Sequence, residues 1–165
     1  MGQPSIDTPF ALARATVQSD WIDYNGHMNV GYYHVAFDLA AEPFFEWLGF
    51  DQRYRKASGT STFALESHLN FLREVKEGDE IRFEARLLAF DHKRVHFYQE
   101  MFHVADGFLA ASYESVSAHV DMNRRKTATM PDMLQARLQK VLDAHQSLER
   151  PWQVGHVISA TPPGK

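Results

Sequence analysis

The sequence predicts an α+β fold in which an antiparallel sheet wraps around one long central helix. Three features indicate this arrangement: an aromatic-rich segment with helical periodicity after residue 29, a run of alternating segments separated by short turns, and a second periodic segment near the end of the chain. The 165 residues suffice for one core that buries roughly two-thirds of the unfolded surface. With no linker or repeat, we expect a single domain over residues 1–165, its core at about 10–145 and loose ends on both sides.

The first half of the chain predicts a strand, a loop and the central helix. The strand is expected from about Phe10 to Gln18, and a loop around Asp23 then leads into a helix from about Asn29. Apolar groups occupy most faces of this helix, so we expect it to be buried widely. Pro43 lacks an N–H group and should kink the helix or begin a second short one. The periodic residues are Val30, Tyr33, His34, Phe37, Ala40, Ala41, Phe44, Trp47 and Leu48.

Antiparallel strands and a closing helix are expected in the second half. Asp91-His92-Lys93 and Asp106-Gly107 are typical of hairpin turns between strands. Pro131 is typical of a helix start, and apolar residues after it recur on one stripe. The expected strands are Phe63–Arg73, with Phe63, Leu65, Leu69 and Phe71 on one face, then Glu80–Phe90, about 95–104, and Leu109–Asp121; the helical stripe is Leu134, Leu138, Val141, Leu142 and His145.

The composition argues against several function classes. The formal net charge is −4 and no basic block is long enough to follow a phosphate backbone, so we expect no nucleic acid partner. The chain has no cysteine, which excludes a cysteine nucleophile, and its histidines lack metal-ligand spacing, so no metal or other cofactor is expected. The segment Met1–Asp7 lacks a signal-peptide pattern and no apolar run could cross a bilayer, so we expect a cytoplasmic protein without membrane partners.

The most informative segment is Asp20–Asn29, which places an acidic residue, a turn and a helix start within ten positions. A helix start presents unpaired N–H groups and the positive end of a dipole. These N–H groups could polarise a carbonyl oxygen while the carboxylate of Asp23, or a water that it activates, attacks the carbon. The segment therefore predicts acyl transfer, although an Asp in such a turn is also common as a cap.

The sequence resembles the hotdog-fold acyl-CoA thioesterases of the 4-hydroxybenzoyl-CoA thioesterase type over roughly residues 10–130. In that family an Asp after the first strand is followed by a Gly-containing turn and the start of the central helix. Here Asp23, Gly26 and the helix from about Asn29 occupy these positions, and Gly26-His27-Met28-Asn29 is similar to the Gly-His-x-Asn form of many relatives. Asn70–Val75 followed by Gly78-Asp79 resembles the family's second strand and turn.

The resemblance implies hydrolysis of an acyl-CoA thioester, with Asp23 as nucleophile or general base. Main-chain amides of residues 29–31 would form the oxyanion site. A hotdog acyl-CoA hydratase or dehydratase and a non-catalytic acyl-CoA binding module remain alternatives. The expected substrate-binding residues are Tyr24, Asn25, His27, Asn29, Val30 and Tyr32.

Within the family, three segments look most like the betainyl-CoA thioesterases of carnitine breakdown: Phe63–His68, Leu72-Arg73-Glu74 and His119-Val120-Asp121. Aromatic side chains near the site are compatible with this, since ring faces can hold a quaternary ammonium, although each ring could equally fill the core. These side chains are Trp21, Tyr24, Tyr32, Tyr33 and Phe37.

Basic residues are expected where the phosphates of CoA bind. The candidates are Lys93-Arg94 in a hairpin and Arg124-Arg125 after the last long strand. The resemblance also implies a homodimer or homotetramer formed by pairing sheet edges, with a site built between subunits. The CoA contacts would then come from the neighbouring subunit.

Overall fold

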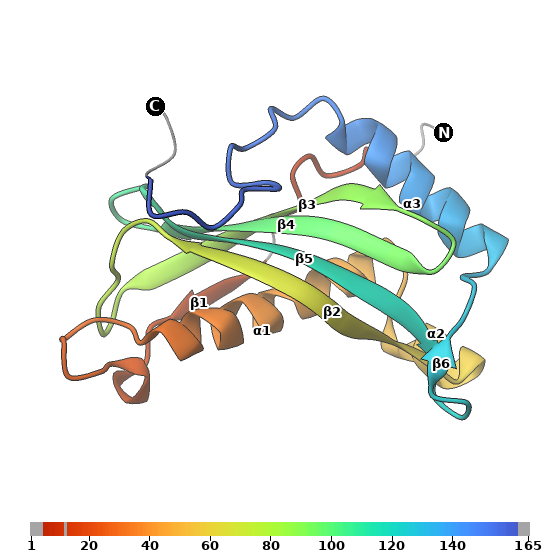
Figure 1. Ribbon diagram of the computed structural model, residues 1–165, viewed down its shortest axis with the longest axis horizontal. Coiled ribbons are helices and arrows are strands. Elements are labelled where there is room, and N and C mark those ends of the chain that lie inside the picture. Colours follow the sequence, from red (N-terminus) through yellow and green to blue (C-terminus); the bar gives the residue numbers. More distant parts are fainter. Residues whose placement is uncertain (1–4, 12, 162–165) are drawn as a thin grey trace.

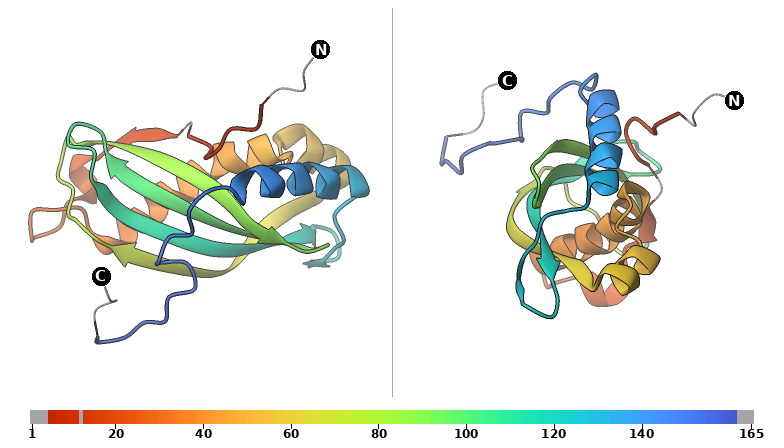
Figure 2. Two further views of the ribbon diagram at one scale, coloured as in Figure 1. Left: turned by 90° about the horizontal axis from the view of Figure 1, so that it is seen from above. Right: turned by 90° about the vertical axis from the view of Figure 1, so that its right-hand side faces the viewer.

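A computed structural model describes residues 5–11 and 13–161 and confirms the α+β arrangement (Figure 1). Within these residues, six strands form one antiparallel sheet of order β1-β3-β4-β5-β2, and β6 pairs with β5. The sheet curls around helix α1, which lies inside the curl when the molecule is viewed end-on (Figure 2). The elements are β1 (Arg14–Thr16), α1 (Val30–Leu48), α2 (Gln52–Ser58), β2 (Thr60–Phe71), β3 (Glu80–Phe90), β4 (Arg94–His103), β5 (Leu109–Asp121), β6 (Lys126–Thr127) and α3 (Asp132–His145).

Helix α1 begins and ends with standard caps. The side chain of Asn29 accepts a hydrogen bond from Gly31 N–H, and Gly49 ends the helix in the left-handed conformation at φ 111°. The helix includes Pro43, so the alternative in which Pro43 begins a second helix is wrong. Phe44 and Phe45 directly after it are buried, and this packing offsets the hydrogen bond that the proline removes.

The central helix is buried on one side only, which corrects the expectation of wide burial. Its buried residues include Phe37, Phe44 and Leu48 and face the sheet. On the opposite side, Val35 and Leu39 are exposed, Leu39 to 59%. A single chain therefore leaves apolar groups of its central helix uncovered.

The predicted strands and the last helix are confirmed, with two corrections: the first strand is Arg14–Thr16 and so shorter than the expected Phe10–Gln18, and an irregularity occurs in β2. Its pairing with β5 shifts between Ala64 and Glu66, which marks a bulge. A bulge adds one residue and reverses which side chains face the helix. Ala64 lines a cavity beside α1 before the bulge, whereas Leu69 packs against the core after it. Phe63 and Phe71 therefore do not share one face, contrary to the sequence prediction.

Strand β2 forms one edge of the sheet (Figure 1). Apolar side chains are exposed along this strand. Leu65 is 56% exposed and Phe71 is 50% exposed, and Leu72 follows them at the end of the strand. An edge strand with unpaired backbone groups and apolar side chains is a template for pairing with another strand.

Helix α3 packs against β3 through His145. The His145 Nδ1 atom accepts a hydrogen bond from Leu87 N–H at 2.9 Å, while Nε2 lies 2.8 Å from the carbonyl of Asp7. Desolvation by burial lowers the pKa of His145 below its ordinary value. The ring is therefore held neutral, with one nitrogen as acceptor and the other as donor.

The described part of the N-terminal segment meets the core at Phe10, close to the expected boundary. Phe10 is buried and bridges Ala85, so the core begins there. Residues 1–4 of the predicted N-terminal end and 162–165 of the C-terminal end lie outside the described residues. No helix in the described ranges is long and apolar enough to cross a membrane, and the cytoplasmic location stays a prediction.

Candidate active site

The Asp23 loop is closed by backbone contacts at both ends. Ile22 and Met28 form an isolated bridge, and Asp23 N–H donates to the carbonyl of His27 at 3.1 Å. Within the loop, Gly26 N–H donates to the carbonyl of Asp23 at 3.0 Å, and Gly26 adopts a φ of 78° that glycine tolerates best. The backbone therefore fixes Asp23 at the start of a short closed loop that leads directly into the central helix.

The carboxylate of Asp23 is half-buried and held on both oxygens. Asn25 N–H donates to Oδ1 at 2.8 Å, and the side-chain amide of Asn29 donates to Oδ2 at 3.3 Å. The other end of that Asn29 amide, Oδ1, accepts from Gly31 N–H at 2.9 Å. One asparagine thus connects the acid to the start of α1.

The main-chain amides of residues 29–31 were proposed as oxyanion donors, and one of these three N–H groups is free to donate to a substrate. Asn29 N–H donates to the carbonyl of Trp21 at 2.9 Å, and Gly31 N–H is used by the cap. In the described part of the chain, the N–H of Val30 has no acceptor within hydrogen-bond distance. The prediction of a donor among residues 29–31 therefore narrows to Val30, the first residue of the helix, where the helix dipole favours negative charge.

The remaining side chains predicted to bind substrate are placed differently. Tyr24 is 97% exposed and turns away from the core, and the ring of His27 lies 3.2 Å from the carbonyl of Met28. Tyr32 stacks on Trp21 at 5.9 Å between ring centres, beside the loop.

The five rings expected around Asp23 do not form a single cage in one chain. Tyr33 packs edge-on against Phe71, and Phe37 is completely buried in the core against Tyr113. For Tyr33 and Phe37 the structure therefore supports the core-filling alternative.

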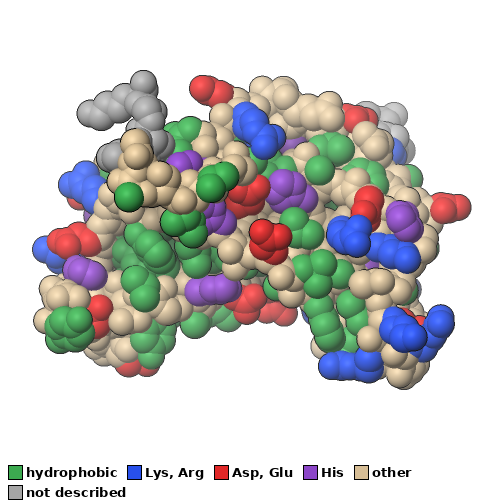
Figure 3. Space-filling model, in the orientation of Figure 1, with side chains coloured by type: hydrophobic (Ala, Val, Ile, Leu, Met, Phe, Trp, Pro, Cys, Tyr) green, Lys and Arg blue, Asp and Glu red, His purple; other side chains and the backbone are tan. Residues whose placement is uncertain are grey.

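The two predicted basic clusters come together in space. Lys93 and Arg124 line one cavity of about 270 Å³ at the turn between β5 and β6, together with Lys126. Figure 3 shows Lys and Arg side chains gathered at this end of the molecule. The sequence placed them in separate loops, and the pairing of β4 with β5 brings the loops together.

Two members of these clusters have partners of their own. Arg94 pairs with Asp91 at 2.8 Å, and hydrogen bonds from Lys93 N–H and from Arg94 hold the pKa of Asp91 below its ordinary value. The guanidinium of Arg125 lies over the ring of Phe63, 5.1 Å from its centre. Arg124 and Lys93 are therefore the better placed of the four for a phosphate.

Within one chain, the acid and the basic residues lie at opposite ends of β2 (Figure 1). At one end, Tyr33 near the start of α1 contacts Phe71, with ring centres 5.2 Å apart. At the other end, Thr60 pairs with Asp121. Asp121 directly precedes the basic turn, which is the turn at residues 122–125 that carries Arg124 and Arg125. A strand of this length spans about 36 Å at ~3.3 Å per residue, so a single chain does not join the two groups.

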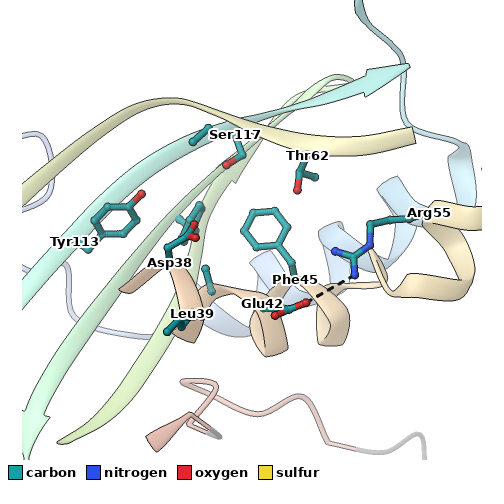
Figure 4. A pocket seen from close by; sticks show the side chains of 11 residues that line it. Asp38, Leu39, Glu42, Phe45, Arg55, Thr62, Tyr113 and Ser117 are labelled. Atoms are coloured by element: carbon teal, nitrogen blue, oxygen red, sulfur yellow. Dashed lines mark ion pairs between the residues drawn. The ribbon is translucent and has the colours of Figure 1, made fainter. Parts of the chain in front are cut away.

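A cavity of about 310 Å³ lies between α1 and β2, close to the exposed edge (Figure 4). Its floor contains the buried rings of Phe45, Phe97 and Tyr113, and its rim carries Asp38 and Glu42 from α1. The remaining lining residues are Leu39, Ala41, Arg55, Thr62, Ala64 and Ser117.

Sequence reasoning did not assign Asp38 to a site. The signal was present as a helical spacing: Asp38, Glu42 and Glu46 recur every four residues and so share one face of an otherwise apolar helix. The spacing could not predict the side of the cavity opposite the helix. That side contains Thr62 and Ser117, which come from strands distant in the chain.

Comparisons with known proteins identify the family of the chain. The family model described as the thioesterase-like superfamily matches residues 17–138. The betainyl-CoA thioesterase of Pseudomonas aeruginosa is 36% identical over 146 residues, which cover 88% of this chain and 92% of that protein. A Rhizobium meliloti L-carnitine dehydrogenase/betainyl-CoA thioesterase is 32% identical over 91% of this chain, which spans 30% of that longer protein.

Solved structures share the fold. A Staphylococcus aureus protein in complex with CoA aligns with a TM-score of 0.86 at 24% identity, covering 97% of this chain and all of that one. A 1,4-dihydroxy-2-naphthoyl-CoA thioesterase from Synechocystis aligns with a TM-score of 0.67 at 14% identity, covering 87% of this chain and 99% of that one. The chain therefore belongs to the thioesterase-like superfamily and has the hotdog fold. Its enzyme class is that of the acyl-CoA thioesterases.

Proposed function

We propose that this protein hydrolyses betainyl-CoA to betaine and free CoA, using Asp23 as its catalytic carboxylate. The observation that carries the proposal is the clamp of Asp23 by Asn25 and Asn29 directly before the unpaired N–H of Val30. The similarity to a betainyl-CoA thioesterase over nearly the whole of both chains supports the choice of acyl group.

The chemistry requires one carboxylate and one oxyanion donor. The thioester carbonyl oxygen accepts a hydrogen bond from Val30 N–H, and the positive end of α1 stabilises the negative charge that develops on it. Asp23 either attacks the carbonyl carbon to give a mixed anhydride, which water then hydrolyses, or removes a proton from the attacking water. In both routes the carbon–sulfur bond breaks and CoA leaves as a thiolate, which needs little help from a general acid.

The complete site is proposed to form between two copies of the chain. If β2 pairs antiparallel with β2 of a second copy, a two-fold axis passes near the middle of the strand. The Phe71 end of one chain then lies beside the Thr60 end of its partner. This operation carries one chain's Asp23 toward the basic turn of the other, so the CoA phosphates would meet Lys93 and Arg124 of the partner copy.

The exposed apolar groups support the same pairing. Leu65 and Phe71 on the edge strand and Leu39 on α1 would be covered by the second copy. Their burial favours association by roughly 25 cal/mol per Å² of apolar surface removed from water. The homodimer is the smallest assembly that completes the site, and a tetramer could be formed from two such dimers.

The function is tested by thiol release from a panel of esters: betainyl-CoA, short aliphatic acyl-CoAs and aromatic acyl-CoAs. We expect betainyl-CoA to have the highest kcat/KM. Release of thiol from none of them would refute the thioesterase function, and saturable binding without turnover would instead indicate a binding module. Hydration of an unsaturated acyl-CoA without thiol release would indicate a hydratase.

The catalytic assignment is tested with Asp23→Asn, which keeps the shape of the side chain and removes its charge. We expect kcat to fall by about 10³-fold or more, since the carboxylate acts on the reacting atoms. Asp20→Asn is the matched control, because Asp20 is exposed in the same loop region and has no partner in the site. Wild-type turnover by Asp23→Asn would contradict the assignment.

A further inference from the structure

We infer that the cavity between α1 and β2 holds the cationic head of the acyl group, and that Asp38 is the main determinant of specificity for a positively charged substrate. This inference rests on the proposed function and extends it to residues on the central helix that the hydrolysis step itself does not use. The cavity has about 310 Å³ of space, enough for a small head group such as a trimethylammonium.

The charge of the lining favours a cation. Asp38 has no ionic or hydrogen-bond partner among the described residues, although Figure 4 shows it at the cavity. Glu42 is partly neutralised by Arg55, with 3.9 Å between the nearest charged atoms. Two carboxylates against one guanidinium leave the cavity with a net negative charge, and the unpaired charge is that of Asp38.

The aromatic floor suits a methylated ammonium rather than a primary one. Phe45 and Phe97 meet edge to face, 5.1 Å between ring centres, and Phe97 lies 6.1 Å from Tyr113. Ring faces attract cations, and an ammonium whose hydrogens are replaced by methyl groups loses no hydrogen bond when it leaves water for such a surface.

Two hydroxyl groups also belong to the lining of the cavity. They are those of Ser117 and Tyr113, residues that are 6% and 3% exposed. Figure 4 shows the Ser117 hydroxyl directed into the cavity. Hydroxyl oxygens at this position can contact the polarised methyl groups of a quaternary ammonium.

The distance between cavity and acid fits a site shared by two chains. Asp38 lies eight residues beyond Val30, or about 12 Å along the helix at ~1.5 Å per residue. In betainyl-CoA the charged nitrogen is only two bonds from the thioester carbon, so Asp23 of the same chain is too far away. Thr62 and Ala64 of the cavity lie near the Thr60 end of β2. In the proposed dimer, that end receives Asp23 of the second copy.

The test compares two esters of nearly the same shape: betainyl-CoA and 3,3-dimethylbutanoyl-CoA, in which a neutral carbon replaces the charged nitrogen. We expect the wild-type protein to favour betainyl-CoA in kcat/KM by about tenfold or more, because the substrate's unit positive charge faces the Asp38 carboxylate, which is exposed in the single chain and would be covered in the dimer. Asp38→Asn should reduce this preference by about tenfold, mainly through a higher KM for betainyl-CoA. Glu42→Gln should reduce it less, because Arg55 already offsets that charge.

Glu46→Gln is the matched control, since Glu46 also lies near Arg55, at 4.0 Å, but does not line the cavity. It should keep the wild-type preference. The inference is overturned if the wild-type protein hydrolyses both esters equally, or if Asp38→Asn slows both to the same extent. Either result leaves the thioesterase function intact, whereas failure to release thiol from any acyl-CoA removes both proposals.

Discussion

A pair of complementing variants tests whether the site is shared between two chains. One chain carries Asp23→Asn and the other carries Lys93→Ala with Arg124→Ala, the two basic residues that line one cavity. Two differently tagged chains allow the mixed dimer to be purified. If the acid of each site comes from one chain and the basic residues from the other, this dimer has one intact site and one site with both defects.

The expected magnitude follows from counting sites and contacts. Each parent homodimer has two defective sites: loss of the carboxylate removes about 10³-fold in kcat, and loss of a charged contact to phosphate costs about 1.5 kcal/mol or more, equivalent to at least about tenfold in kcat/KM. The mixed dimer should recover about half of the wild-type activity, because one of its two sites is complete.

The assay is thiol release from betainyl-CoA at a substrate concentration below KM. The mirror control is a mixed dimer of a wild-type chain with a chain that carries all three substitutions. A shared site predicts that this control is nearly inactive, because each site has one defect. A site contained in one chain predicts the reverse: about half activity in the control, and only the residual activity of the two defective sites in the complementing pair. That reversed pattern would refute the reasoning.

Three further predictions follow from particular contacts. Asn29→Asp keeps the acceptor of the helix cap but replaces the amide that donates to Asp23 with a like-charged carboxylate, so kcat should fall while the fold is retained; an unchanged kcat would show that Asn29 does not position the acid. Burial lowers the pKa of His145, so the unfolded chain binds a proton more readily than the folded chain. The free energy of unfolding should therefore fall as the pH drops from about 6.5 toward the lower pKa of the folded state. In His145→Gln, the urea midpoint of unfolding should depend less on pH over this range than in the wild type. Leu65→Glu should shift sedimentation toward the monomer and lower activity, whereas Met133→Glu, at a residue exposed on α3, should leave the dimer intact; a Leu65→Glu dimer would contradict the proposed interface.

Local patterns predicted most of the elements. Alternation and the turn residues gave β3 and β5 with bounds that match the structure, and the stripe after Pro131 gave α3. The bulge in β2 was missed because an extra residue is fixed by pairing with β5, not by local alternation. Helix α2 and strand β6 were also missed, since each is short and depends on its neighbours.

The site was predictable to the extent that it is local. Asp23, Gly26 and Asn29 lie within seven residues, so a turn and a helix cap suffice to bring them together, and the sequence by itself determined this arrangement. The tertiary structure decided the rest: it left Val30 N–H unpaired, buried Phe37 in the core, and faced Asp38 with Ser117 across a cavity. The physical reason is that sequence spacing fixes contacts within one turn of a helix or one hairpin, whereas contacts between a helix and a distant strand depend on how the whole sheet curls around it.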